Sequence, residues 1–205
     1  MGNSIETLPP SARARRGLGR SFQDARLFPA LTVAETIATS LERWVEAGDP
    51  LTAALRLPAG QLTEAAVASR VAELLEVFNL VHLRRTPIAE LSTGTRRMVD
   101  LACVVAHGPS VVLLDEPTSG IAQREAEALG PVLVDLRRNL DASMIIIEHD
   151  ISLICAVSDR LVALDSGAVV TAGVPAEVLN HRAVVASYLG TSPEALNRSD
   201  QTISD

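Results

Sequence analysis

The sequence contains no lysine, so all eighteen of its basic residues are arginines. Aromatic residues make up only 2% of the 205 residues, and a hydrophobic core must therefore be built from Leu, Val, Ile and Ala. No apolar run approaches the roughly 18 residues that a membrane-spanning helix needs, and the opening residues lack the apolar stretch of a secretory signal. We expect one globular domain, or a core domain with a small helical insertion, that contacts a membrane only through a partner.

Negative charge and a low cysteine content narrow the choice of function. The formal net charge of -7 argues against broad binding to nucleic acid, which depends on basic patches. The two cysteines, Cys103 and Cys155, lie in apolar stretches with a helical pattern. This setting favours two buried thiols, although a disulfide between them also fits the sequence.

The first half of the chain is predicted to be mostly helical. Thr32-Val33-Ala34-Glu35 has the spacing of a capping box, which predicts that a helix begins there. A loop is expected around Pro58 and Gly60, and apolar residues recur at helical spacing after Glu64. The predicted elements are a short helix at 10–16, a short strand at 18–23, and helices at 32–47 and 64–78.

The second half has the pattern of an α/β sheet. Short apolar runs at 111–114, 144–147 and 161–164 are each followed by an acidic residue, and a helical stretch at 123–139 separates the first two. Strand, helix and strand in this order, with strands that are apolar on both faces, predict a parallel sheet covered by helices. The third strand is expected to turn back at residues 165–167 as a hairpin.

Two acidic residues stand at the end of the first apolar strand. Asp115 and Glu116 follow VVLL, and the carboxyl ends of parallel strands are where α/β folds hold ligands. One carboxylate can hold Mg²⁺ through its water shell while the next polarises an attacking water. An apolar strand that simply ends in an acidic turn would have the same sequence.

Three further groups are candidates for contact with phosphate. His149 ends the next strand, where it can donate a hydrogen bond to a γ-phosphate or cap the following helix. The segment Ser92-Thr93-Gly94-Thr95 stands at the start of a helix, where it can bind an anion or serve as an ordinary N-cap. Gln23 follows a short strand and can touch metal, water or phosphate, although most glutamines are only solvated.

The order of these motifs resembles that of ABC ATPases. Phe22-Gln23, a helical region, LSTGT, LLDEPT and IIIEHD follow one another, and the match extends over essentially the whole chain before its polar tail. The stretches most similar to the ATPases of branched-chain amino-acid importers are SFQDARLFPALTVAETI, DEPTSGI, IEHDISLICAVSDRLVALDSGAVVTAGVPAEVL and ASYLG. The fold that this resemblance implies is α/β, a partial P-loop NTPase core with a parallel sheet, plus an α-helical subdomain.

The resemblance also implies a role for each motif. Gln23 would be the Q-loop residue, in contact with metal and facing the membrane subunits. Asp115 would organise Mg²⁺, Glu116 would act as general base, and His149 would contact the γ-phosphate. Leu91–Thr95 would be the signature that reaches ATP held by a second ATPase subunit. The implied partners are that subunit and transmembrane permease subunits, at the cytoplasmic face of the plasma membrane.

The sequence departs from the family's pattern at three places. Thr93 and Thr95 replace the usual Gly and Gln of the signature, and Thr93 is expected to reduce backbone freedom. Ser119–Ala122 lacks the usual acidic or amide residue at its end. Without lysine, the chain cannot contain the phosphate-binding P-loop, G-x-x-x-x-G-K-[ST]. Residues 14–21 have P-loop spacing with Arg20 in place of lysine, but the prolines before them exclude the buried strand that a P-loop follows.

We therefore expect the chain to begin partway through an ATPase domain. The predicted division is a core remnant at 1–23, a helical subdomain at 24–107, the rest of the core at 108–191 and a polar tail at 192–205. The expected function is to couple ATP hydrolysis to uptake of branched-chain amino acids or similar small polar solutes, without activity in the isolated chain. The alternative is a non-catalytic partner that donates its signature to an intact ATPase subunit.

Overall fold

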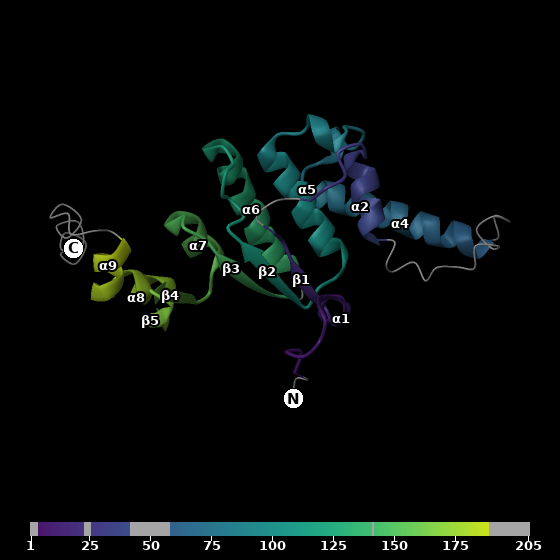
Figure 1. The fold of residues 1–205 in the computed structure, drawn as a ribbon. Helices are drawn as coiled ribbons and strands as arrows, with labels where there is room; N and C mark the ends of the chain where they lie inside the picture. The colour runs from purple at the N-terminus through teal and green to yellow at the C-terminus, as the bar shows by residue number, and fades with distance from the viewer. Residues whose placement is uncertain (1–3, 23–25, 42–57, 141, 189–205) are drawn as a thin grey trace. The chain divides into compact units, whose positions relative to one another are not determined.

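The computed structural model describes residues 4–22, 26–41, 58–140 and 142–188, and Figure 1 shows them as a coloured ribbon. The chain forms two compact units, at residues 1–151 and 152–205. Gln23, the end of the helix predicted at 32–47 and the predicted tail at 192–205 lie outside the described residues.

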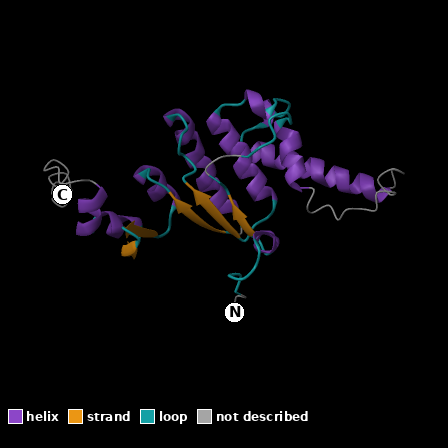
Figure 2. Cartoon of the chain, viewed as in Figure 1, coloured by secondary structure: helices purple, strands orange, loops and turns teal. Residues whose placement is uncertain are grey.

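The first unit contains a three-stranded parallel sheet. Its strands are β1 (Leu18–Arg20), β2 (Val111–Asp115) and β3 (Ser143–Ile147), in the order β1-β2-β3. Helix α6 (Gln123–Asn139) connects β2 to β3, as predicted. This arrangement confirms the α/β fold class, and it places the carboxyl ends of β2 and β3 at one edge of the sheet (Figure 2).

Only one face of this sheet is well buried among the described residues. Val112 and Leu114 point to the buried face and are at most 2% exposed. A Cβ on Gly19, which pairs with Val112, would lie 2.9 Å from Val104 of helix α5 (Thr93–Ala106), so α5 packs closely on this face. On the opposite face, Ile145 and Ile147 are 58% and 57% exposed. The expected cover of helices is therefore present on one face of the sheet and not on the other in the described part of the chain.

Helices make up the rest of the first unit. They are α1 (Pro10–Arg15), α2 (Val33–Leu41), α4 (Pro58–Val77) and α5, with 3₁₀ turns η2 (Val81–Leu83) and η3 (Ile88–Glu90). The capping box that opens α2 is present, because the Thr32 N–H donates to the Glu35 carboxylate over 2.8 Å and the Glu35 N–H donates to Thr32 Oγ1 over 3.3 Å. The loop predicted around Pro58 and Gly60 is wrong, since α4 begins at Pro58. Proline is compatible with the first turn of a helix because its missing N–H has no partner there.

The second unit contains a hairpin and short helices. They are β4 (Leu161–Asp165), β5 (Ala168–Gly173), α8 (Pro175–Leu179), α9 (Arg182–Tyr188) and most of α7 (Ile151–Val157). The strands are antiparallel, and Asp165 pairs with Ala168 across a two-residue turn. Ser166 and Gly167 in that turn have φ angles of 49° and 80°, which suit the twist of a tight hairpin. The predicted hairpin is confirmed.

Candidate functional site

The carboxyl ends of β2 and β3 bring the predicted catalytic residues together. Glu116 directly follows β2, and His149 lies two residues beyond the end of β3. His149 Nε2 is 3.0 Å from Glu116 Oε1, and because an ionised carboxylate only accepts, the imidazole nitrogen is the donor. The pairing of β2 with β3 explains this contact between side chains 33 residues apart.

Glu116 has an unusual backbone conformation. Its φ angle is 46°, in the left-handed region that non-glycine residues rarely adopt. Its N–H donates to the carbonyl of Ile147 over 2.9 Å, which extends the β2–β3 pairing by one residue. Such a conformation costs about 1–3 kcal/mol and is concentrated at functional sites. Here it turns the Glu116 carboxylate out of the alternation of β2 and toward the loop after β3.

Asp115, the predicted metal ligand, is paired with an arginine. Arg20 Nη2 lies 3.4 Å from Asp115 Oδ2, and both side chains are about half exposed. Arg20 also lies over the ring of Phe22, with 5.1 Å to the ring centroid. No cluster of three or more His, Cys, Asp or Glu side chains suited to a metal occurs in the described residues. A single carboxylate still fits Mg²⁺, which binds proteins through one or two carboxylates and takes its other oxygens from phosphate and water.

The signature segment forms the first turn of α5. Ser92 is the N-cap, and its Oγ accepts from the Thr95 N–H over 3.2 Å. Thr93 is the first residue of α5 and has a helical backbone, so the expected loss of backbone freedom has no cost at this position. The structure therefore supports the interpretation of Ser92 as an ordinary N-cap. Contact of residues 92–95 with nucleotide stays a prediction.

Glu125 contacts the signature segment, which sequence reasoning did not anticipate. The Ser92 hydroxyl donates to Glu125 Oε1, and a Cβ on the buried Gly94 would lie 2.6 Å from Glu125 Cβ. Glu125 stands in the first turn of α6, 33 residues from Ser92 along the chain. No local pattern predicts this contact, because it depends on how α5 and α6 pack.

A second unanticipated residue is the buried Arg97 of α5. It is 5% exposed, and its guanidinium donates to the carbonyl of Phe22, the residue before Gln23. This contact fixes the end of the segment that leads to the predicted Q-loop. Asp100, one turn further along α5, is also partly buried, and burial raises its pKa to about 6 even though Arg97 acts to lower it.

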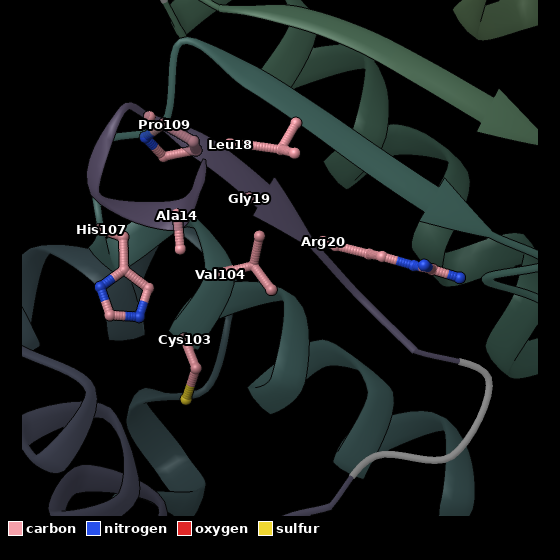
Figure 3. A pocket seen from close by; sticks show the side chains of 9 residues that line it. Ala14, Leu18, Gly19, Arg20, Cys103, Val104, His107 and Pro109 are labelled. Carbon is pink, nitrogen blue, oxygen red and sulfur yellow. The ribbon is translucent and has the colours of Figure 1, made fainter. Parts of the chain in front are cut away.

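A cavity of about 230 Å³ lies between α1, β1 and α5 (Figure 3). Burial raises the pKa of the Cys103 thiol at this cavity to about 12, so that thiol is not reactive at neutral pH. Residues 14–21 have the spacing of a P-loop, but they form the end of α1 followed by β1. A P-loop requires the opposite order, a strand followed by a helix. None of the predicted site residues that the structure describes lines the cavity. Its lining consists of Ala14, Gly17, Leu18, Gly19, Arg20, Cys103, Val104, His107 and Pro109.

The sequence pattern of the family described as "ABC transporter" matches residues 2–119, more than half of the chain. The chain belongs to the ABC transporter family. The high-affinity branched-chain amino acid transport ATP-binding protein LivG of Salmonella typhimurium is 30% identical over 186 residues, which are 91% of this ABC chain and 72% of LivG. BraF of Pseudomonas aeruginosa, described in the same words, is 29% identical over 92% of the chain and 74% of BraF. The lipopolysaccharide export system ATP-binding protein LptB of Haemophilus influenzae is 31% identical over 92% of the chain and 72% of LptB.

Solved structures agree with this assignment. The structure of cbiO1 from Clostridium perfringens, part of the ABC transporter complex cbiONQ, has a TM-score of 0.68 at 26% identity, over 93% of this chain and 69% of that chain. An ATP-binding cassette of an ABC transporter in its ADP conformation has a TM-score of 0.65 at 22% identity, over 88% of this chain and 71% of that one, and shows the shared fold. Among the described residues of the ABC chain, every helix is too short or too polar to span a bilayer.

Proposed function

We propose that the chain is the ATPase subunit of an ABC importer and couples ATP hydrolysis to uptake of branched-chain amino acids or similar small polar solutes. One observation carries the proposal: Glu116 and His149 are 3.0 Å apart at the carboxyl ends of paired parallel strands, directly beside Asp115. A base and a hydrogen-bond donor held together at this edge suit the positioning of water against a phosphoryl group.

Each residue has a role in the proposed reaction. Asp115 is the carboxylate that would hold Mg²⁺ once Arg20 has moved away, and the ion would supply positive charge to the phosphates of ATP. Glu116 orients the attacking water and accepts its proton, and His149 donates a hydrogen bond to the γ-phosphate. Ser92 and Gly94 reach the nucleotide of a second ATPase subunit, and Gln23 faces the transmembrane permease subunits at the cytoplasmic face of the membrane.

The phosphates of ATP need a further group that these residues do not supply. A P-loop requires a lysine, and the 205 residues contain none. We place the P-loop on a strand–loop–helix unit, either in a longer form of this chain or on another polypeptide. The exposed sheet face supports this placement, because Asp115 lies on the same face as Ile145 and Ile147, and parallel sheets are normally covered on both sides.

The proposed cargo is supported by the LivG and BraF matches. Both proteins are described as branched-chain amino acid transport ATP-binding proteins and align with more than nine-tenths of the chain. LptB is equally similar and is described as part of a lipopolysaccharide export system. The cargo therefore has to be tested separately from the ATPase role.

Substitutions made in the gene at its own chromosomal position test the ATPase role and the cargo, because the protein is then produced in its natural form. Glu116→Gln should reduce uptake of radiolabelled leucine at least about tenfold, since it removes the proposed base. Glu127→Gln, on an exposed position of α6, removes the same charge and should leave uptake unchanged. If uptake of leucine is unaffected while that of another small solute is lost, the cargo assignment is wrong. If no uptake changes, the ATPase role is wrong.

A second candidate is a non-catalytic subunit that donates its signature to an intact ATPase. The absence of lysine and the pairing of Asp115 with Arg20 favour it, because both leave the chain's own nucleotide site incomplete. The same uptake assay separates the candidates. Thr93→Arg adds a bulky group at the exposed start of α5 and should block the partner's nucleotide in either case. Loss of uptake with Thr93→Arg but not with Glu116→Gln would favour the second candidate.

A further inference from the structure

We propose that Glu148 is a positioning residue that ties the loop after β2 to the loop after β3 and thereby holds His149 against Glu116. This inference deepens the proposed function, on which its catalytic meaning rests. Glu148 lies between the end of β3 and His149, and its side chain is half-buried.

The Glu148 carboxylate accepts hydrogen bonds from both loops. Its Oε1 accepts from the backbone N–H of Thr118 over 2.8 Å and from the Thr118 hydroxyl. Its Oε2 accepts from the backbone N–H of His149 over 2.8 Å and from that of Asp150 over 3.4 Å. An ionised carboxylate has about four acceptor positions, so this set uses its full capacity. Hydrogen bonds to a charged acceptor are roughly twice as strong as neutral ones.

The position of these bonds explains how Glu148 acts on the site. Thr118 is two residues after Glu116, and Glu148 is directly before His149. The Glu148 carboxylate therefore joins the two loops next to Glu116 and His149, the two residues whose side chains are in contact. The His149 side chain is 77% exposed, so packing around the imidazole cannot fix it. Its place must be set by the backbone that carries it, and Glu148 holds that backbone.

A simpler role for Glu148 is to cap the following helix. Two of its four hydrogen bonds, from His149 and Asp150, lie just before α7 and would serve that purpose alone. The two bonds from Thr118 do not contribute to a cap, because Thr118 belongs to the other loop, 30 residues away. Substitutions at Thr118 therefore separate positioning from capping.

The test is NMR spectroscopy of the purified full chain without nucleotide. Long-range proton–nitrogen spectra of the imidazole rings report whether His149 Nε2 carries a hydrogen-bonded proton. The chain has four histidines, and His149→Gln identifies the signal. Amide exchange at Thr118 and His149 reports the hydrogen bonds that these two N–H groups donate to Glu148. Exchange at Leu114 in the buried sheet reports whether the fold is intact.

We expect Glu148→Ala to remove the hydrogen-bonded Nε2 signal and to speed amide exchange at Thr118 and His149 at least about tenfold, as for loss of a bond to a charged acceptor. Thr118→Val keeps the shape of the side chain but removes its hydroxyl, so it should weaken the His149 signal, whereas Thr118→Ser should preserve it. Glu127→Gln is the matched control and should change nothing.

An unchanged His149 signal in both Glu148→Ala and Thr118→Val, with Leu114 still protected, would overturn the positioning role. A signal that is lost in Glu148→Ala while amide exchange at Thr118 stays at the wild-type rate in that variant would also overturn it, because Glu148 would then act only as a helix cap. Since no nucleotide is present, these outcomes do not depend on whether the chain takes part in ATP hydrolysis. Failure of the uptake test with a positive NMR result would instead reject the proposed function.

Discussion

Arg20 Nη2 lies 3.4 Å from Asp115 Oδ2, so the carboxylate that we assign to Mg²⁺ is already paired with a cation. Both side chains are about half exposed, and a pair so accessible to solvent contributes at most about 1 kcal/mol. Arg20→Ala should therefore tighten binding of Mn²⁺, used in place of Mg²⁺, by about two- to fivefold. Titration followed by electron paramagnetic resonance measures the free Mn²⁺ directly.

Two variants control this measurement. Asp115→Asn should abolish the Mn²⁺ site in either background, because it removes the proposed ligand. Arg70→Ala removes a cation that pairs with Glu73 on α4 and should not alter Mn²⁺ binding. Equal affinities of wild type, Arg20→Ala and Asp115→Asn would show that Mn²⁺ binds elsewhere on the chain.

Gly94 and Glu125 should be energetically coupled. A methyl group on Gly94 would lie 2.6 Å from Glu125 Cβ, so Gly94→Ala should lower the free energy of unfolding by about 1–3 kcal/mol through overpacking. In the Glu125→Gly background the same substitution should cost less than about 1 kcal/mol, because the Cβ atom that makes the clash is gone. Urea unfolding of the four proteins in this double-mutant cycle measures the coupling. A cost for Gly94→Ala that is the same in both backgrounds would contradict the contact.

The sequence was sufficient for features that depend on neighbouring residues or on a strand's end. The Thr32–Glu35 capping box predicts the start of α2, and the acidic residues after the apolar strands predict which side chains meet at the sheet edge. The sequence was not sufficient for contacts between distant segments. Glu125 reaches Ser92 across 33 residues and Arg97 reaches Phe22 across 75, and neither pair has a local pattern that reports helix packing.

Burial of Asp100 should make stability depend on pH. Burial raises its pKa from 3.8 to about 6, so the folded state holds the Asp100 proton more tightly than the unfolded chain does. Its contribution to the free energy of unfolding is then fully present below about pH 4 and is lost as the pH rises through 6, by at most about 3 kcal/mol. Asp100→Asn should remove this pH dependence and be more stable than wild type at pH 7.5 by about 1–3 kcal/mol.

Urea unfolding of wild type and Asp100→Asn between pH 4 and pH 7.5 checks this expectation. The difference between the two curves isolates Asp100 from the other carboxylates. Asp135→Asn, at an exposed position of α6, is the matched control and should track wild type. If wild type instead gains stability relative to Asp100→Asn as the pH rises, Asp100 is stabilised in its ionised form, contrary to the effect of its burial.

The two faces of the sheet should respond differently to substitution. Leu114 is 2% exposed, and Leu114→Ala should lower the free energy of unfolding by about 2–5 kcal/mol because it leaves a cavity. Ile145 is 58% exposed, so Ile145→Arg should cost the isolated chain less than about 1 kcal/mol. In the cell, however, Ile145→Arg should abolish solute uptake, because the P-loop unit that we place on this face would have to bury the charge. Strong destabilisation of the isolated chain by Ile145→Arg would show that the face is already covered, and normal uptake would show that nothing packs against it in the working transporter.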